Sequence, residues 1–183
     1  MVNYINEVSK EKLARLWNDM NTRCYNEKFH ERQPQYQDCE VCKEWLSDKT
    51  KFFDWVDENY YIVGDEQMDL DKDILVKGNK VYSPSTCVFV PHSINTLFLN
   101  GKKNRGDCPL GVYFDKSKNK FAVCFAIDRN SIKLGRYDTK EKAFAVYKRH
   151  KESLIMATAD RYKGKIPTHL YNAMLAWEIE ETD

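Results

Sequence analysis

The 183-residue sequence predicts an α+β fold, in which a module of helices and short strands precedes a three-stranded antiparallel sheet packed on a helix. Two stretches near the start carry apolar residues at helical spacing, which indicates amphipathic helices. Three short apolar or alternating segments between residues 110 and 137 are joined by brief polar turns, which indicates neighbouring antiparallel strands. The segment 100–107 contains no apolar side chain. We therefore expect one domain over residues 1–100 and a second over residues 101–183.

The first domain is expected to contain two helices, over residues 8–23 and 48–59. Their apolar faces consist of Leu13, Leu16, Trp17 and Met20 in the first, and of Phe52, Trp55, Val56 and Tyr60 in the second. Ser47 or Asp48 caps the second helix. Residues 26–37 are polar and include Pro34, so we predict a loop there. Short strands follow over residues 60–91, and the last of them ends at Pro91.

The second domain is expected to hold strands over residues 110–114, 120–127 and 132–137. The middle strand alternates, so that one side carries Phe121, Val123, Phe125 and Ile127, and the other carries Ala122, Cys124 and Ala126. A helix follows, because Asp138 and Glu141 have the spacing of a capping box. Its buried face against the sheet consists of Ala143, Phe144, Tyr147, Leu154 and Ile155. A break at residues 163–165 precedes a C-terminal helix with Pro167 in its first turn.

Charge is distributed unevenly, although the net charge is only +1. Residues 38–75 hold twelve acidic side chains against four basic ones, a net of −8. Residues 101–136 hold nine basic side chains against three acidic ones, a net of +6. This asymmetry predicts a basic surface that meets a polyanion. Segregation of charge by chance on solvated faces is the other interpretation.

The basic residues fall where a sheet could read the major groove of DNA. The predicted DNA-binding residues are Arg105, Lys118, Lys120, Arg129, Lys133 and Arg136. Lysines would contact phosphates, and arginines could read guanine through two parallel hydrogen bonds. The small side chains of Ala122 and Ala126 would allow close approach to the groove. A sheet face that is basic only for solubility would show the same charges.

Four sequence stretches in the second domain resemble the APETALA2-type DNA-binding domain. They read Gly111-Val112-Tyr113-Phe114, Lys120-Phe121-Ala122-Val123, Leu134-Gly135-Arg136-Tyr137-Asp138-Thr139 and Glu141-Lys142-Ala143-Phe144-Ala145-Val146-Tyr147. The resemblance covers residues 105–150 and implies a sheet that binds the major groove. Residues 101–183 would then be this domain with a C-terminal helical extension.

The first domain resembles phage-type HNH homing-endonuclease relatives, in which such a module commonly precedes an APETALA2-type domain. The resemblance rests on the stretches Asn59-Tyr60-Tyr61, Leu70-Asp71-Lys72-Asp73, Tyr82-Ser83-Pro84-Ser85-Thr86-Cys87-Val88-Phe89-Val90-Pro91 and Ile94-Asn95. It implies a degenerate ββα module with Asp71, Lys72 and Asp73 at the catalytic positions. An HNH site needs a histidine base, and this sequence has Lys72 where the histidine is expected. His92 lies near the motif, but beyond Pro91.

Two metal sites are conceivable. Alternation would place Asp69, Asp71 and Asp73 on one strand face, where they could hold Mg²⁺ or another divalent cation. A solvated acidic strand is the competing interpretation. Cys39 and Cys42 have the spacing of half a zinc site, which Cys24 and Cys87 could complete. We favour buried, reduced cysteines over zinc.

These observations predict a phage or prophage protein that binds double-stranded DNA, descends from an HNH homing endonuclease, and cleaves weakly or not at all. One alternative is an active, metal-dependent HNH-type endonuclease. Another is a phage inhibitor of a host nuclease, of the anti-CRISPR or anti-restriction kind, with the acidic segment mimicking DNA. No stretch of eighteen apolar residues and no signal peptide is visible, so we expect a cytoplasmic protein without membrane partners.

Overall fold

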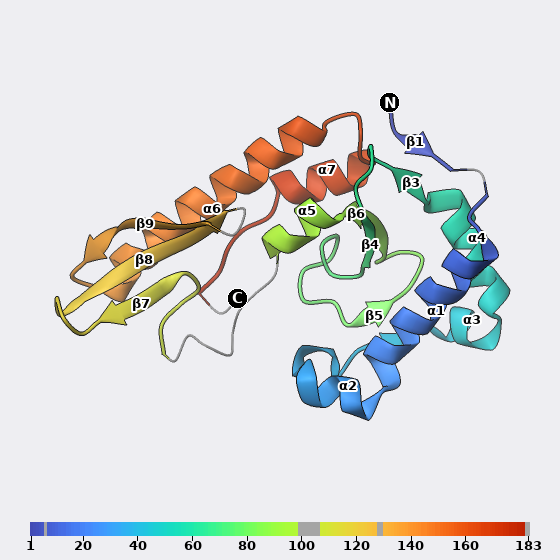
Figure 1. The fold of residues 1–183 in the computed structure, drawn as a ribbon, viewed down its shortest axis with the longest axis horizontal. Helices are drawn as coiled ribbons and strands as arrows, with labels where there is room; N and C mark the ends of the chain where they lie inside the picture. Colours follow the sequence, from blue (N-terminus) through green and yellow to red (C-terminus); the bar gives the residue numbers. More distant parts are fainter. Residues whose placement is uncertain (6, 99–106, 128–129, 182–183) are drawn as a thin grey trace. The chain divides into compact units, whose positions relative to one another are not determined.

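The computed structural model describes residues 1–5, 7–98, 107–127 and 130–181 (Figure 1). The chain forms two compact units, Met1–Thr96 with Tyr162–Ala173, and Leu97–Arg161 with Met174–Asp183. Helices and small, mostly antiparallel sheets together confirm the predicted α+β class. Within the described ranges, none of the helices has the length and apolar character needed to span a membrane.

The first unit contains helices and short strand pairs. Its elements are β1 (Asn3–Tyr4), α1 (Lys10–Tyr25), α2 (Glu27–Arg32), a 3-10 turn (Pro34–Tyr36), β2 (Glu40–Val41), α3 (Lys43–Ser47), α4 (Lys49–Asn59), β3 (Tyr61–Ile62), β4 (Met68–Asp71), β5 (Val81–Tyr82), β6 (Val88–Pro91), α5 (His92–Asn95) and most of α7 (Thr168–Leu175). Strand β1 pairs antiparallel with β3, β2 pairs parallel with β5, and β4 pairs antiparallel with β6.

An aromatic cluster forms the core of this unit. The rings of Trp45 and Phe52 are fully buried, with centroids 4.9 Å apart, and Trp17 from α1 lies 5.5 Å from Phe52. Burial of aromatic side chains supplies the largest apolar areas available to a small core. Helix α4 begins where the sequence predicts it, because the Asp48 side chain accepts a hydrogen bond from the Thr50 amide at 3.0 Å.

The predicted loop over residues 26–37 is wrong, because the segment contains α2 and a 3-10 turn. The Asn26 side chain caps α2 by accepting a hydrogen bond from the Phe29 amide at 2.9 Å. Helix α2 has no buried residue, so it carries no apolar repeat that periodicity could detect. Pro34 opens the 3-10 turn, where its missing amide hydrogen costs no hydrogen bond.

Strands β4 and β6 are joined by a long connection and are followed at once by α5. Their register pairs Asp69 with Val90 and Met68 with Pro91, so the proline lies inside the end of the strand rather than after it. All four residues of β6 are buried, and the Tyr61 hydroxyl donates to the Phe89 carbonyl at 2.8 Å. The pairing brings the side chain of Asp69, near the start of β4, close to the residues of α5.

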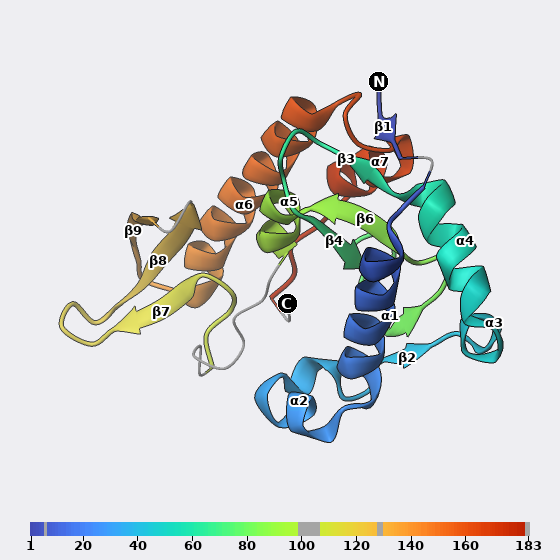
Figure 2. The same cartoon turned by 45° about the vertical axis from the view of Figure 1, so that its right-hand side comes forward.

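The second unit is the predicted sheet with its helix. Strands β7 (Val112–Asp115), β8 (Lys120–Ile127) and β9 (Asn130–Tyr137) are antiparallel in the order β7-β8-β9, and α6 (Lys140–Tyr162) follows. Helix α6 runs along one face of the sheet, as both views show (Figures 1 and 2). The predicted strand order, the strand directions and the packing of the helix on the sheet are confirmed.

The face of the sheet against α6 is apolar. Val112, Val123 and Phe125 are buried there, and the ring of Phe125 lies 5.8 Å from that of Tyr147 on α6. Gly111, with φ +75°, lies so close to Tyr147 that an added Cβ would overlap the ring. Glycine is therefore required here both by the backbone and by the packing.

On the opposite face, one expectation fails. Ala122 was expected to be exposed, but it is 3% exposed, between its cross-strand neighbours Tyr113 and Arg136. A methyl group between two long side chains is covered by them. The side chain of Ala126 lies outside what the structure describes. A register shift between Val123 and Cys124 leaves one extra residue on β9, a bulge that increases local twist.

Candidate functional site

The outer face of the sheet, defined here as the face opposite α6, carries exposed long side chains. The strand registers place Tyr113 beside Ala122, Ala122 beside Arg136, and Cys124 beside Lys133. Tyr113 is 41% exposed, and the side chains of Lys120 and Arg136 are 46% and 44% exposed. Lys133 and Lys118 are also exposed. Four of the cations predicted to bind DNA therefore lie in solvent, on the sheet or its turn.

Two of these cations are held by carboxylates of the same unit. The Nε nitrogen of Arg136 donates to Oδ2 of Asp115 at 2.8 Å, and Nζ of Lys120 lies 3.0 Å from Oδ1 of Asp138. Hydrogen bonds from Ser117 and Arg136 lower the pKa of Asp115 to about 2, so this carboxylate is ionised at neutral pH. Asp115 thus orients Arg136, and among the described residues nothing accepts from its two terminal nitrogens.

The remaining predicted cations differ in status. Lys118 and Lys133 form no ion pair with any residue that the structure describes. Arg105 and Arg129 lie outside the described residues. The sheet therefore offers two unpaired lysines and two paired cations, which is enough positive charge for phosphate contacts but less than the sequence count suggests.

A second polar cluster, which the sequence did not reveal, lies at the end of the β4–β6 pair. Oδ2 of Asp69 accepts from Nδ1 of His92 at 2.7 Å and from Nδ2 of Asn95 at 3.0 Å. Oδ1 accepts from Nε2 of Gln67 at 2.8 Å. The antiparallel register places Val90 opposite Asp69, and the first residues of α5 then turn back toward the carboxylate. His92 was set aside in the sequence because it follows Pro91.

The contact with Asp69 holds the imidazole ring of His92 in one orientation. Burial alone would raise the pKa of Asp69, but hydrogen bonds from Asn95, His92 and Gln67 lower it overall. An ionised Asp69 fixes the proton of His92 on Nδ1 and leaves Nε2 with its lone pair in the neutral ring. The His92 side chain is 57% exposed, whereas that of Asp69 is 12% exposed. A solvent-facing imidazole held in one tautomer can accept a proton from water or from a ligand.

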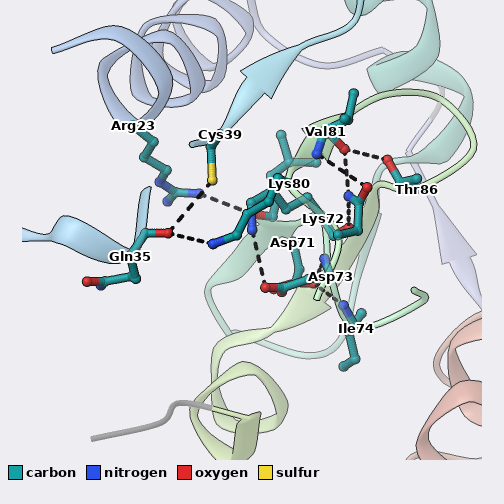
Figure 3. A network of polar contacts seen from close by, with 12 residues as sticks. Arg23, Gln35, Cys39, Asp71, Lys72, Asp73, Ile74, Lys80, Val81 and Thr86 are labelled. Atoms are coloured by element: carbon teal, nitrogen blue, oxygen red, sulfur yellow. Dashed lines mark hydrogen bonds and ion pairs between the residues drawn. The ribbon is translucent and has the colours of Figure 1, made fainter. Parts of the chain in front are cut away.

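The residues expected to be catalytic lie in a different environment (Figure 3). Lys72 is 6% exposed, and its Nζ lies 3.2 Å from Oδ2 of Asp73 and 5.8 Å from the ring centre of Tyr82. Burial would lower the pKa of Lys72, but the charge of Asp73 and the hydrogen bond to it act in the opposite direction, and the pKa is raised overall. The lysine therefore stays protonated at neutral pH and has no lone pair with which to activate water.

Asp71 ends the strand instead of continuing its alternation. Its Oδ1 accepts from the amides of Asp73 and Ile74, at 2.9 and 2.7 Å, so the chain turns immediately after β4. Burial, followed by the charge of Asp73, raises the pKa of Asp71 to about 6. The expected alternation holds for Asp69 and Asp71, which share one face of β4, but not for Asp73, because the strand ends at Asp71.

The described residues contain no group of three or more His, Cys, Asp or Glu side chains that could hold a metal ion. Asp69 is directed to His92 and Asn95, while Asp71 is directed to its own turn. These side chains do not form one ligand set for Mg²⁺, and the divalent cation stays a sequence prediction.

All six cysteines are free thiols. Burial raises the pKa of Cys24 and Cys87 to about 12, and it also raises that of Cys39. Thiols with such pKa values are protonated at neutral pH, and thiolate is the form that binds zinc. Cys39 is therefore a buried, protonated thiol, whereas Cys42 is only partly buried, and zinc binding by the pair stays untested.

The acidic segment 38–75 is partly used inside the fold. Asp57 accepts from the amide of Val8 at 2.8 Å, and Glu66 accepts from Ser93 at 2.6 Å and from the hydroxyl of Tyr162. The carboxylates of Asp69 and Asp71 accept the internal hydrogen bonds described above. Carboxylates with internal partners are less available to imitate the phosphates of DNA, and the inhibitor hypothesis stays a prediction.

Comparison of the chain with known protein families, with curated proteins and with solved structures finds no match. The resemblances to HNH and APETALA2-type proteins therefore stay sequence predictions.

Proposed function

We propose that this protein binds double-stranded DNA, with the outer face of the β7–β9 sheet in the major groove. The observation that carries the proposal is a sheet whose inner face is covered by α6 and whose outer face exposes Lys120, Lys133 and Arg136. A sheet supported on one side and cationic on the other is a geometry that enters the major groove.

The two kinds of cation would have different roles. The lysines would contact phosphates, which gives affinity that falls with salt because counterions are released. Arg136 has its Nε bound to Asp115, so its two terminal nitrogens can reach O6 and N7 of one guanine. Because the guanidinium is already fixed before DNA binds, less side-chain entropy is lost on binding. This favours base-specific hydrogen bonds over non-specific attraction to the phosphates.

We further propose a phage or prophage protein descended from an HNH homing endonuclease, with little or no cleavage. The order β4, β6, α5 supports this, because two antiparallel strands followed by a helix form a ββα unit. The buried, protonated Lys72 supports weak activity, since it occupies the position expected for the base.

The test is a fluorescence-anisotropy titration of a labelled duplex with the full chain over several salt concentrations. We expect the triple variant Lys120→Gln, Lys133→Gln, Arg136→Gln to bind more weakly, with a salt dependence reduced by about two phosphate contacts, those of the two lysines. The matched control removes three exposed lysines of the first unit, Lys28, Lys43 and Lys49. Equal loss in both variants, with both folded by circular dichroism, would contradict binding by the sheet.

Cleavage is the second candidate, and the Asp69–His92 pair favours it. His92 Nε2 could replace the missing base, since in the neutral ring the contact with Asp69 holds the proton on Nδ1 and leaves Nε2 as the acceptor. Plasmid DNA incubated with Mg²⁺ or Mn²⁺ tests this candidate. Nicking that disappears in His92→Ala but persists in Lys72→Met would establish an endonuclease whose base is His92. Intact plasmid under all conditions would leave DNA binding as the function.

A further inference from the structure

A groove lies between α1 and β4 in the first unit, whereas the sheet that carries the proposed function belongs to the second unit. Its volume is about 250 Å³, which is enough for a phosphate group with part of an attached sugar. Its lining residues are Lys12, Arg15, Leu16, Asp19, Met20, Arg23, Gln67, Met68, Asp69 and Leu70. The cationic side chains all come from α1, and the apolar side chains come from both α1 and β4.

The cations line the groove because of helical spacing. Lys12, Arg15, Asp19 and Arg23 are separated by three or four residues, so they lie on one face of α1. The Nη1 nitrogen of Arg23 is bound to the Leu70 carbonyl at 3.2 Å. Lys12 binds the Tyr60 hydroxyl, and its Nζ lies 4.3 Å from the centre of that ring. These two cations are held in place.

Arg15 differs from both neighbours. It is exposed, and among the described residues its guanidinium has no hydrogen-bond or ion-pair partner. Asp19 lies one turn further along the helix but makes no ion pair with Arg15. A guanidinium at the edge of a concave site, with all its donors available, is suited to a planar or tetrahedral oxyanion.

The balance of charge in the groove is positive. Three cations line it against two carboxylates, and Asp69 is one of these. Both oxygens of Asp69 accept hydrogen bonds, from Gln67, His92 and Asn95, so its negative charge is already stabilised by these donors. Asp19 alone opposes Lys12, Arg15 and Arg23.

We propose that this groove binds a phosphate group, with Arg15 as its bidentate ligand and Lys12 and Arg23 as fixed neighbouring charges. The partly exposed side chain of Leu16 would contact the sugar attached to the phosphate, while Met20 and Leu70 are buried beneath the groove. Phosphate could come from the backbone of duplex DNA or from a free nucleotide, since both present the same oxygens. The site belongs to the first unit and does not depend on DNA binding by the sheet.

The experiment uses the full chain and two charge-matched variants of α1. Arg15→Gln removes the free guanidinium, while Lys10→Gln removes an exposed cation that does not line the groove. Each protein is titrated with inorganic phosphate, with a nucleoside 5′-monophosphate and with a short duplex, by calorimetry and by NMR of arginine Nε–H groups. We expect Arg15→Gln to weaken phosphate and nucleotide binding about tenfold, the value of one charge-assisted bidentate contact, and Lys10→Gln to leave it unchanged.

The duplex arm identifies the source of the phosphate. If Arg15→Gln also weakens duplex binding in the sheet triple variant, the groove holds a backbone phosphate. If duplex binding is unchanged there, the groove serves a free phosphate ligand. No phosphate binding by the wild-type chain, or equal losses in Arg15→Gln and Lys10→Gln, would overturn the proposal. The titrations with phosphate and with nucleotide still test the groove even if the sheet binds no DNA.

Discussion

The Nδ1 atom of His92 lies 2.7 Å from Oδ2 of Asp69, although 23 residues separate them in the chain. The pairing of β4 with β6 brings them together, because it places the start of α5 beside the side chain of Asp69. The contact combines an exposed imidazole with a carboxylate that is 12% exposed, which is the arrangement that fixes a histidine tautomer. It gives the first unit a proton acceptor at a position that the linear motif does not mark.

Replacement of Asp69 should destabilise the protein more than replacement of His92. Asp69→Ala leaves three donors without their acceptor, which we expect to cost about 2 kcal/mol of unfolding free energy, whereas His92→Ala should cost less than about 1 kcal/mol, because its ring is exposed. Urea denaturation at pH 7 measures both. Equal costs would show that the hydrogen bonds from Gln67 and Asn95 to Asp69 contribute nothing to stability beyond the contact with His92.

The same carboxylate predicts a pH dependence. Its pKa in the folded protein lies below the ordinary value of 3.8, so Asp69 stabilises the fold above about pH 4 and loses this contribution as pH falls through the folded pKa. The difference in unfolding free energy between wild type and Asp69→Asn should therefore shrink below pH 4. A difference that stays constant from pH 7 to pH 3 would contradict the low pKa.

Replacing Asp115, the partner of Arg136, should raise the affinity for DNA and lower the sequence specificity. Asp115→Asn removes a negative charge from the DNA-binding face, so we expect tighter binding to random duplexes, by about threefold. It also releases Arg136, so selection from a random duplex pool should give a less defined guanine preference. Arg136→Lys is the control, because it keeps the positive charge but loses the two parallel N–H donors of the guanidinium. A sharper preference in Asp115→Asn would show that the carboxylate hinders readout.

Gly111→Ala should destabilise the second unit strongly. The new methyl group would overlap the ring of Tyr147 in a backbone conformation with φ +75°, and we expect a cost of about 3 kcal/mol. Thermal unfolding of the full chain measures it. In the background of Tyr147→Ala the same substitution should cost only about 1–2 kcal/mol, the penalty of the left-handed backbone. Equal costs in both backgrounds would mean that the ring moves aside freely.

Lys151→Met should stabilise the second unit at neutral pH. Lys151 is 9% exposed on α6, with its Nζ 5.8 Å from the ring centre of Phe125, and burial lowers its pKa to about 8. The folded state therefore bears the cost of a buried charge below pH 8, about 3 kcal/mol from the shift relative to 10.5. That cost is relieved between pH 8 and pH 10.5, where only the unfolded lysine stays protonated.

The gain from Lys151→Met should accordingly be largest at pH 7 and shrink as pH approaches 10. Lys148→Met, one turn earlier, is the control, because Lys148 pairs with Glu152 at 3.1 Å and donates to the Ile179 carbonyl at 2.8 Å. It should destabilise the protein at pH 7. A gain from Lys151→Met that does not vary with pH would reflect packing alone.

Much of the fold was predictable because its signals are local. The alternation of Phe121, Val123 and Phe125 identified the middle strand and the face that packs on α6. Asp48 marked the start of α4 through a hydrogen bond to a residue two positions away. Helix α2 escaped detection because it buries no side chain, and a helix without an apolar face resembles a polar loop in sequence.

The sequence by itself determined the α+β class, the antiparallel order of β7–β9 and the presence of cations on that sheet, since all of these depend on neighbours within a few residues. Only the tertiary structure decided which polar side chains meet. The β4–β6 register brought His92 to Asp69, the turn after Asp71 took Asp73 out of the strand, and the carboxylate of Asp115 bound one nitrogen of Arg136. Side-chain contacts of this kind depend on strand register and on where a strand ends, and a shift of one residue reverses the face on which every side chain lies.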